Sequence, residues 1–395
     1  MVAGGRERQA APMDEGGVTP AVAATAAARP EAGREVVQQD LRYIADEVGF
    51  EPMAGKRLLI TGGAGFLGYY LVQAPLLWNQ GVSRDRRIDV TVCDNYIRST
   101  PAWLMEHAAD DSLHVLKHDI TKSVPDAAAN YDYIIHAASI ASPIYYRQHP
   151  IETMDANIYG LRHLLDHSLQ QRDRAHPISG FLFFSSSEIY GDAAPDRIPT
   201  SEDYWGNVSC TGPRACYDES KRFGETMSVN FARQHGLPIT VARPFNNYGP
   251  GLRLSDQRVL PDFARDVLAG RDIVLLSDGG ATRTFCYVAD AIAGYYKVLL
   301  RGRAGEAYNI GTESPEISMR QLATKVAELS RQLFDYRGAV VLGTSADQDY
   351  LTHNPSRRCP SIVKARAELQ FAPKVGLEDG LRRLLTWYAT HEHAN

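Results

Sequence analysis

The segment Tyr217-Asp-Glu-Ser-Lys221 carries a phenol and an ammonium group that could take part in acid–base chemistry. Residues four apart lie on the same face of a helix, one turn from each other. A positive charge close to a phenol stabilises the phenolate and lowers the pKa of the phenol from about 10. This spacing is common in helices, but here it follows the polar run Ser185-Ser-Ser-Glu188. The combination predicts Tyr217 as a base that removes a proton from a hydroxyl group.

A glycine-rich turn predicts a phosphate-binding site. The run 57–61 is typical of a buried strand, and it leads directly into Gly62-x-x-Gly65-x-x-Gly68 and an apolar helix. Glycine lets the backbone turn tightly and approach a pyrophosphate, which sits at the helix N-terminus. Asp94 ends the next predicted strand, where its carboxylate can bond the ribose hydroxyls of an adenosine. The pattern predicts NAD rather than NADP, because Asp94 would repel a 2′-phosphate.

Further residues bear on the cofactor. Asp119 and Ile120 close the third predicted strand, and we expect them at the adenine edge. Arg98 is a small reservation to the prediction of NAD, because its guanidinium could receive the 2′-phosphate of NADP. We expect Lys221 to hold the nicotinamide ribose as well as to assist Tyr217.

These residues need a scaffold, and strands alternate with helices along the chain up to residue 244. Strand-like runs after the first lie at 88–93, 113–117, 131–136, 181–186 and 239–243, and long helical segments at 150–170 and 217–234. Such alternation predicts parallel βαβ units. The expected fold class is α/β, a Rossmann-like doubly wound parallel sheet with a smaller, mixed C-terminal substrate domain.

The predicted domain organisation has four parts. Residues 1–30 are rich in Ala, Gly and Pro and are expected to be a disordered tail. Residues 31–55 form a helix and a linker, residues 56–244 the NAD-binding domain, and residues 245–395 mainly the substrate domain, with some return to the Rossmann core. The helix has one apolar stripe, with polar residues expected outside it; the stripe is Val37, Leu41, Ile44 and Val48, and the outer residues are Asp40, Arg42 and Glu47.

Composition excludes several classes of protein. The chain has 395 residues, 44% of them hydrophobic, and a net charge of −5. That length allows two domains with a sizeable core. Its scattered basic residues argue against nucleic-acid binding, and no apolar run approaches the roughly 18 residues of a membrane span. The 5 cysteines form no CxxC pair, which argues against a disulfide scaffold or a common zinc site and favours the reducing cytoplasm.

Longer motifs point to one family. They are Ile60-Thr-Gly-Gly-Ala-Gly-Phe-Leu-Gly68, His136-Ala-Ala-Ser139, Ala141-Ser-Pro143, Ser201-Glu-Asp-Tyr-Trp-Gly206, Gly212-Pro-Arg-Ala-Cys-Tyr-Asp-Glu-Ser-Lys-Arg222, Arg243-Pro-Phe-Asn-Asn-Tyr-Gly-Pro250 and Arg358-Cys-Pro-Ser-Ile362. On these motifs, residues 56 to 388 resemble the extended short-chain dehydrogenase/reductases of the NAD-dependent epimerase/dehydratase type, which modify nucleotide sugars. The two runs that begin at Ser201 and Gly212 are the more specific ones. They most resemble the UDP-glucuronate decarboxylases, or UDP-xylose synthases.

The resemblance implies an intramolecular redox cycle on a nucleotide sugar. Tyr217 would remove the proton of the sugar 4-hydroxyl while C4 loses a hydride to NAD. The 4-keto product is a β-keto acid, which loses CO2 to leave an enolate stabilised by donors from Tyr217 and Ser186. After C5 is protonated the hydride returns to C4, so NAD ends unchanged and the product is an NDP-pentose such as UDP-xylose.

The resemblance also assigns site residues. It makes Ser186, Glu188, Tyr217, Lys221 and Arg358 catalytic. Arg358 would bind the substrate carboxylate or the enolate, because a guanidinium is a fixed positive fork and a poor acid, and Glu188 would orient water or protons. The cofactor would be bound by Gly62, Gly65, Phe66, Leu67, Gly68, Asp94, Asn95, Arg98, Asp119, Ile120, Ala137, Ala138, Ser139, Tyr217 and Lys221. The substrate would be bound by Ser142, Arg214, Asn246, Arg258, Arg283 and Arg358, although a structural salt bridge is an alternative for each arginine.

The resemblance further implies a homodimer formed through the helices at 150–170 and 217–234. Two acidic residues depart from the family pattern, because Glu152 and Asp155 stand where lysines are usual. They leave open a different NDP-uronate, or a neutral NDP-hexose that undergoes 4-epimerisation or 4,6-dehydration. A non-catalytic NAD or nucleotide-sugar sensor is the remaining alternative; the intact redox residues argue against it, since a sensor needs none of them.

Overall fold

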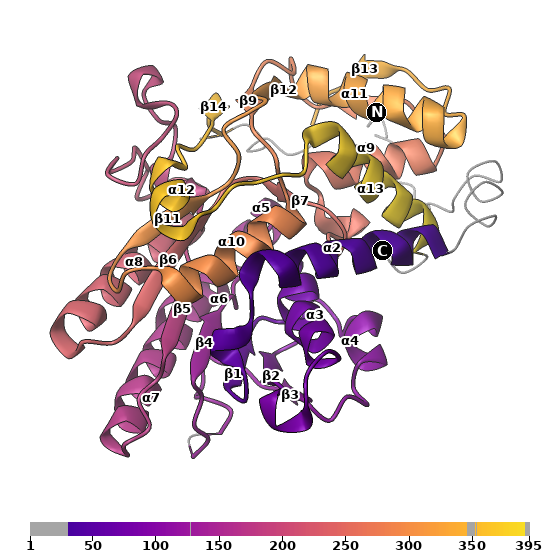
Figure 1. Cartoon of the computed structure of the whole chain (residues 1–395). Helices are drawn as coiled ribbons and strands as arrows, with labels where there is room; N and C mark the ends of the chain where they lie inside the picture. The colour runs from indigo at the N-terminus through magenta and orange to yellow at the C-terminus, as the bar shows by residue number, and fades with distance from the viewer. Residues whose placement is uncertain (1–30, 127, 346–351, 353, 392–395) are drawn as a thin grey trace, which may run out of the picture.

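A seven-stranded parallel sheet forms the centre of the molecule (Figure 1). The computed structural model describes residues 31–126, 128–345, 352 and 354–391, so the predicted tail at 1–30 lies outside the described residues. Strand order is β3-β2-β1-β4-β5-β6-β11, and every neighbouring pair is parallel. The strands are β1 (Arg57–Thr61), β2 (Asp89–Asp94), β3 (Leu113–Lys117), β4 (Tyr133–His136), β5 (Gly180–Phe184), β6 (Ile239–Pro244) and β11 (Ala307–Ile310). The predicted Rossmann-type sheet is confirmed.

The inner strands are buried on both faces, which explains why β1, β4 and β5 are mainly apolar runs, whereas the edge strand β3 is only partly buried. Leu58 and Ile60 of β1 pack into one core cluster, and Leu59 between them packs into another on the opposite face. Helices α3 (Gly68–Asn79) and α10 (Val288–Arg301) contribute to the first cluster. The second takes side chains from α7 (Leu161–Asp173) and α8 (Ala215–His235). The predicted helix at 150–170 is α6 (Pro150–Asp155), a π-helical turn (Ala156–Gly160) and α7.

The chain after β6 builds shorter elements above the sheet edge (Figure 1). One of its strands, β11, returns to the central sheet beside β6. Short sheets are formed by β12-β9-β14, β10-β7 and β13-β8. The elements are β7 (Asn247–Tyr248), α9 (Val259–Leu268), β8 (Ile273–Leu275), β9 (Thr282–Arg283), β10 (Cys286–Tyr287), β12 (Ile317–Ser318), α11 (Met319–Phe334), β13 (Val340–Leu342), β14 (Arg357–Arg358), α12 (Val363–Leu369) and α13 (Leu377–Thr390).

Helix α2 (Glu31–Val48) packs against α3, α10 and α13 and so contacts both halves of the chain (Figure 1). Its predicted apolar stripe is buried, but Asp40, which was expected outside the stripe, is fully buried as well. The Asp40 carboxylate accepts hydrogen bonds from the hydroxyls of Tyr70 and Tyr287, each at 2.6 Å, and pairs with Arg383 at 2.7 Å. The prediction was wrong for Asp40 because a helix enclosed by three others buries more than one stripe.

No helix in the described ranges is long and apolar enough to cross a membrane.

Two short helices, α4 (Ala102–Glu106) and α5 (Pro143–Gln148), follow β2 and β4 in the chain. From β1 the chain adds β2 and β3 on one side of the sheet and then β4, β5 and β6 on the other side. The carboxyl ends of β1 and β4 therefore form the switch point at which parallel sheets bind ligands.

Candidate active site

A cavity of about 1220 Å³ opens at the carboxyl edge of the sheet. Its lining includes the glycine turn after β1, the ends of β2, β4 and β5, and segments from the C-terminal third of the chain. Apart from Ser142, every residue predicted for cofactor, catalysis or substrate lines this cavity. The structure therefore brings residues that are far apart in the sequence, such as Gly62 and Arg358, to one cavity.

Ser142 is the one predicted substrate residue outside the cavity lining. Its side chain is buried and does not line the cavity, because its hydroxyl donates to the backbone carbonyl of Asp256 at 3.0 Å. The loop that follows β4 thus turns this side chain away from the cavity, and its neighbours Ala141 and Pro143 line the cavity instead. In the structure Ser142 ties two loops together, and its role in substrate binding stays a prediction.

The glycine turn fits a dinucleotide phosphate. Gly62 has φ +72°, and a Cβ at this position would lie 2.5 Å from Ala138 Cα. A Cβ on Gly68, the first residue of α3, would lie 2.0 Å from the carbonyl oxygen of Gly63. The turn can therefore close only with glycine, which leaves backbone N–H groups and a helix N-terminus facing the cavity. Asp94 accepts from the backbone N–H groups of Ala64 at 3.0 Å and Tyr96 at 2.8 Å. A carboxylate has about four lone-pair sites, so Asp94 can also accept from a ribose.

Tyr217 and Lys221 lie on α8, which begins immediately after the loop that carries the Gly212-Pro-Arg run. Both side chains are buried, and Lys221 Nζ lies 5.7 Å from the centre of the Tyr217 ring. The ammonium donates to the backbone carbonyl of Phe184 at 2.7 Å, at the end of β5. Burial lowers the pKa of Lys221 to about 7. This lysine therefore changes charge close to neutral pH.

The expected low pKa of Tyr217 is not found. Burial raises the pKa of Tyr217 to about 12, and the Ser186 hydroxyl beside it opposes only part of that rise. The spacing of Tyr217 and Lys221 indicates a nearby positive charge but not the loss of water around the phenol. Here the effect of desolvation on the pKa of Tyr217 is the larger one. Tyr217 is a neutral phenol at pH 7 in this structure.

Glu188 is clamped between two arginines. It lies on a 3₁₀ turn (Ser187–Tyr190) that is capped by Ser186, whose hydroxyl accepts from the Glu188 N–H at 3.2 Å. Arg358 contacts Glu188 from β14, which pairs with β9. Arg214, the residue that precedes α8, also contacts Glu188. Arg358 Nη2 lies 2.7 Å from Glu188 Oε2, Arg358 Nη1 pairs with Oε1, and Arg214 Nη2 pairs with Oε2.

The clamp sets the charge of Glu188. Burial alone would raise the pKa of Glu188, but Arg214 and Arg358 overcome this effect and hold the pKa well below its usual range. Glu188 therefore stays ionised and is a poor acid. Arg358 was expected to bind the substrate carboxylate or the enolate, with a structural salt bridge as the alternative; in the structure its guanidinium pairs with Glu188.

Asp218 is a residue that the sequence reasoning missed. Its carboxylate is buried behind the clamp, with Oδ2 3.9 Å from Arg214 Nε, and within the described part of the chain Oδ1 has no hydrogen-bond partner. Burial, reinforced by the nearby negative charge of Glu188, raises the pKa of Asp218 to about 7. Its position directly after Tyr217, inside the most specific motif, was the available signal. It does not line the cavity.

Two residues expected at the substrate diphosphate use much of their hydrogen-bonding capacity on the protein itself. Arg283 donates to the carbonyls of Thr282 at 2.7 Å and Ser356 at 3.3 Å. Burial and the neighbouring Arg358 lower the pKa of Arg283 to about 9. Asn246 donates to the carbonyl of Thr284 at 2.9 Å. Both line the cavity, and Arg283 also holds the segment that precedes Arg358, whereas Asn246 holds the residue after β9.

Glu152 and Asp155, the two departures from the family pattern, both line the cavity from α6. Helix α6 packs against α8, so these carboxylates lie on the wall formed near the catalytic helix. The cavity wall therefore carries two carboxylates at positions where the family resemblance implies lysines.

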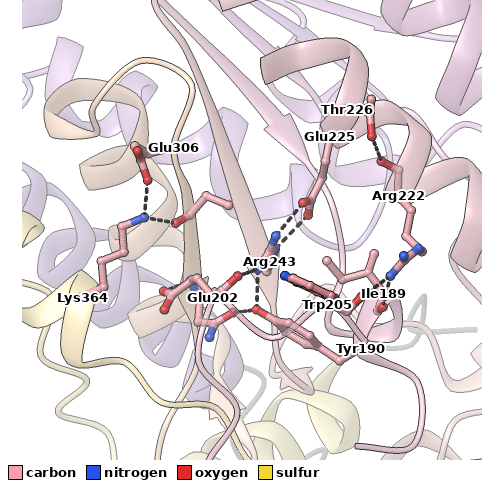
Figure 2. A network of polar contacts seen from close by, with 12 residues as sticks. Ile189, Tyr190, Glu202, Trp205, Arg222, Glu225, Thr226, Arg243, Glu306 and Lys364 are labelled. Carbon is pink, nitrogen blue, oxygen red and sulfur yellow. Dashed lines mark hydrogen bonds and ion pairs between the residues drawn. The ribbon is translucent and has the colours of Figure 1, made fainter. Parts of the chain in front are cut away.

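A polar network behind the cavity holds the loop of the Ser201-Glu-Asp-Tyr-Trp-Gly run (Figure 2). Arg243, at the end of β6, pairs with Glu225 of α8 at 2.6 Å and donates to Tyr190 Oη at 2.6 Å and to the Glu202 carbonyl at 2.8 Å. Arg222 of α8 donates to the Trp205 carbonyl at 2.6 Å. The network thus links the sheet, the turn that carries Glu188 and the helix that carries Tyr217.

Comparisons with known proteins show the family of this chain. The model of the NAD dependent epimerase/dehydratase family matches residues 58–311. The chain is 36% identical over 325 residues to UDP-glucuronic acid decarboxylase 6 of Arabidopsis thaliana, which covers 82% of this chain and 86% of that protein. It is 34% identical over 333 residues to UDP-glucuronic acid decarboxylase 1 of Xenopus tropicalis, which covers 84% of this chain and 72% of that protein.

Solved structures share the fold. The UDP-glucose 4-epimerase of Thermotoga maritima, solved with UDP-glucose, superposes with a TM-score of 0.69 at 25% identity and covers 84% of this chain and 98% of its own. The dTDP-glucose 4,6-dehydratase DesIV of Streptomyces venezuelae, solved with NAD, gives 0.68 at 27% identity and covers 84% and 96%. These matches confirm the resemblance that the motifs predicted. The chain belongs to the NAD-dependent epimerase/dehydratase family.

Proposed function

We propose that this protein decarboxylates UDP-glucuronate, or another NDP-uronate, through a 4-keto intermediate to an NDP-pentose such as UDP-xylose. The observation that carries the proposal is the clamp of Glu188 between Arg214 and Arg358, on the cavity wall beside Ser186 and Tyr217. The similarity to UDP-glucuronic acid decarboxylases over 82% of the chain supports it. NAD, held by the turn at 62–68 and by Asp94, would supply the hydride acceptor for C4.

Oxidation at C4 needs a base, and Tyr217 is the proposed one. Its raised pKa of about 12 opposes this step, since the phenol must lose its own proton first. Protonated Lys221 favours the phenolate, and with a pKa of about 7 this lysine changes charge in the working range. The raised pKa suits the following step, in which Tyr217 and Ser186 donate hydrogen bonds to the oxygen on C4.

Loss of CO2 breaks the C5–C6 bond of the 4-keto sugar, and the electron pair moves onto C5, C4 and the C4 oxygen. Arg214, Arg283 and Arg358 provide positive charge on the cavity wall where a carboxylate can be held. The permanent charge of Glu188 repels that carboxylate, and the repulsion ends when the carboxylate leaves as neutral CO2. Because Glu188 is a poor acid, we assign it to orienting the water that protonates C5.

A second candidate function is favoured by Glu152 and Asp155. Two carboxylates on the cavity wall suit a neutral hexose better than a uronate, so 4-epimerisation or 4,6-dehydration of an NDP-hexose is the alternative. That reaction uses the same C4 oxidation and requires no loss of CO2.

One experiment separates these functions. Purified protein with NAD is incubated with UDP-glucuronate, UDP-glucose or dTDP-glucose, and the nucleotide sugars are analysed by mass spectrometry. Decarboxylation predicts an NDP-pentose from UDP-glucuronate alone, with release of CO2. Unchanged UDP-glucuronate together with an isomerised or dehydrated hexose would overturn the decarboxylase proposal in favour of the alternative. Binding without any turnover would indicate a sensor.

We also propose that the protein forms a homodimer through α6, the π-helical turn and α8. These elements expose three large apolar side chains, Ile151, Tyr159 and Phe223, which are 58%, 57% and 49% exposed. Helices α6 and α8 pack together, so the exposed side chains belong to adjacent elements. A second copy of the chain would remove these apolar surfaces from water.

A further inference from the structure

Asp256 is a buried carboxylate that two cavity arginines share. Its side chain is 5% exposed and does not line the cavity. Arg98 Nη1 pairs with Oδ1 of Asp256, and Arg258 Nε lies 2.8 Å from Oδ2. Both arginines line the cavity. Each carboxylate oxygen therefore holds one guanidinium at the cavity wall.

The two arginines come from opposite sides of the proposed ligand arrangement. Arg98 stands four residues after Asp94, in the loop on the proposed cofactor side. Arg258 immediately precedes α9, among the residues assigned to the nucleotide sugar. Asp256 is thus the residue through which a side chain on the cofactor side contacts one on the substrate side.

Further contacts join the same segments. Arg253 donates to the backbone carbonyl of Arg98 and lies 3.2 Å from Ser99 Oγ. Arg258 donates to the Ala141 carbonyl at 3.1 Å, and the Ser142 hydroxyl bonds the Asp256 carbonyl. Loops after β2, after β4 and before α9 therefore meet at Asp256.

The backbone around this junction is held in an unfavourable form. Tyr96, Ser99 and Gln257 have φ values of 57°, 73° and 52°, in the left-handed region that non-glycine residues rarely adopt. Such conformations persist only where surrounding contacts maintain them, and they are frequent at ligand clamps. One of them adjoins Asp256 and the other two flank the segment that contains Arg98.

We propose that Asp256 is a positioning residue that couples the binding of NAD to the binding of the nucleotide sugar. A nucleoside diphosphate that engages Arg258 orders Asp256, and Asp256 then holds Arg98 against the cofactor. Binding of the second ligand then costs less conformational entropy, which gives positive coupling without any direct contact between the two ligands. This inference rests on the proposed function, because it assumes that both ligands occupy the cavity.

The test measures the loss of NADH from the holoenzyme, with UDP as the probe. NADH release is followed by fluorescence after addition of excess NAD, with and without UDP. In the unaltered protein we expect UDP to slow NADH loss on the order of tenfold, within the usual range of allosteric coupling. Asp256→Asn keeps both arginines but removes the shared charge, so the slowing should largely disappear. Asp256→Glu keeps the charge and should restore part of it.

Glu225→Gln is the matched control. Glu225 is a partly buried carboxylate, 13% exposed, that pairs with Arg243 (Figure 2). Neither residue of this pair lines the cavity. Its loss should destabilise the protein to a comparable extent, measured by thermal unfolding, while UDP still slows NADH loss fully. Equal loss of coupling in both variants, or undiminished coupling in Asp256→Asn, would overturn the inference. If the unaltered protein fails to bind UDP at all, the proposed function fails with it. If the unaltered protein binds both ligands independently, only the coupling is refuted.

Discussion

Tyr146 lies face to face with Tyr217, with ring centroids 5.1 Å apart and ring planes 9° from parallel. Tyr146 is buried, and among the described residues its hydroxyl has no hydrogen-bond partner. Two phenols thus lie side by side on the cavity wall, and only Tyr217 has Lys221 one helical turn away. The stacked pair offers a matched test of the proposed base.

Tyr217→Phe should lower hydride transfer by about 10²–10⁴-fold, because the variant lacks the group that accepts the C4 hydroxyl proton. The readout is the absorbance of bound NADH in a single turnover. Tyr146→Phe keeps the stack and removes a hydroxyl without a partner, so its effect should be much smaller. Equal losses in the two variants would show that the stack, and not the phenol of Tyr217, matters.

Glu188→Gln should leave C4 oxidation in place and slow the loss of CO2, so that a 4-keto nucleotide sugar accumulates in mass spectra. Arg358→His should have the same effect, since either change opens the clamp. Breaking a buried ion pair costs about 3–5 kcal/mol, so unfolding must be measured in parallel. Glu316→Gln, which removes the partially exposed partner of Arg357 on the same strand, is the control. Unimpaired CO2 release in the clamp variants would refute the roles assigned to Glu188 and Arg358.

Asp40→Asn should destabilise the protein by about 1–3 kcal/mol, because Arg383 would lose its buried partner and keep only the exposed one, Asp379 at 2.9 Å. Tyr70 and Tyr287 would still have an acceptor at this position, so the loss isolates the ionic contact. Urea unfolding measures the change. Glu35→Gln on the exposed side of the same helix should have almost no effect. A loss below about 1 kcal/mol for Asp40→Asn would place the pair with surface ion pairs.

His136 should make the protein sensitive to acid. Burial lowers the pKa of His136 to about 3, whereas an unfolded chain binds the proton near pH 6.5. Below about pH 6.5 the unfolded state therefore takes up a proton that the folded state refuses, and stability falls by up to about 1.4 kcal/mol per pH unit down to the folded pKa. In His136→Gln, urea midpoints should decline less steeply between about pH 6.5 and pH 5. Replacing the exposed His176 should leave that slope unchanged.

Phe223→Glu should convert the proposed dimer to a monomer, because the charge would be buried against a second copy without a partner. Light scattering after gel filtration gives the mass. Val363→Glu is the control, since Val363 is 62% exposed but lies on α12, away from α6 and α8. A dimer that survives Phe223→Glu and Tyr159→Glu would place the interface elsewhere.

The sheet could be predicted from sequence because its inner strands are buried on both faces. The runs 57–61 and 113–117 match β1 and β3 at both ends. Strand β1 is buried after Arg57, whereas β3 lies at the sheet edge with His114 and Lys117 exposed. The glycine turn was equally predictable, because its steric demands are local. The residues that line the cavity were found mainly through motif resemblance, which carries long-range information.

The structural features that the sequence did not indicate depend on contacts with residues far away in the chain. Asp40 resembled a surface residue because its partners Tyr70, Tyr287 and Arg383 lie 30, 247 and 343 residues away in the chain. The pKa of Tyr217 was misjudged because spacing reveals a nearby charge and not the extent of burial. The hydrogen bond from Ser142 to the Asp256 carbonyl joins residues 114 positions apart, and no local sequence pattern indicates it.

The position of β11 bears on how the chain folds during synthesis. Strand β6 leaves the ribosome well before β11, and the whole segment 245–306 must follow before its partner exists. Until then β6 is an unpaired, apolar sheet edge, the kind of surface on which other chains add strands. The helices and loops made in that interval include Asp256 and Arg258, whereas Arg358 of the cavity wall is made only after β11. A slow step in making residues 245–306 would therefore expose the nascent protein to aggregation, even though every residue of the glycine turn and of α8 had already been made.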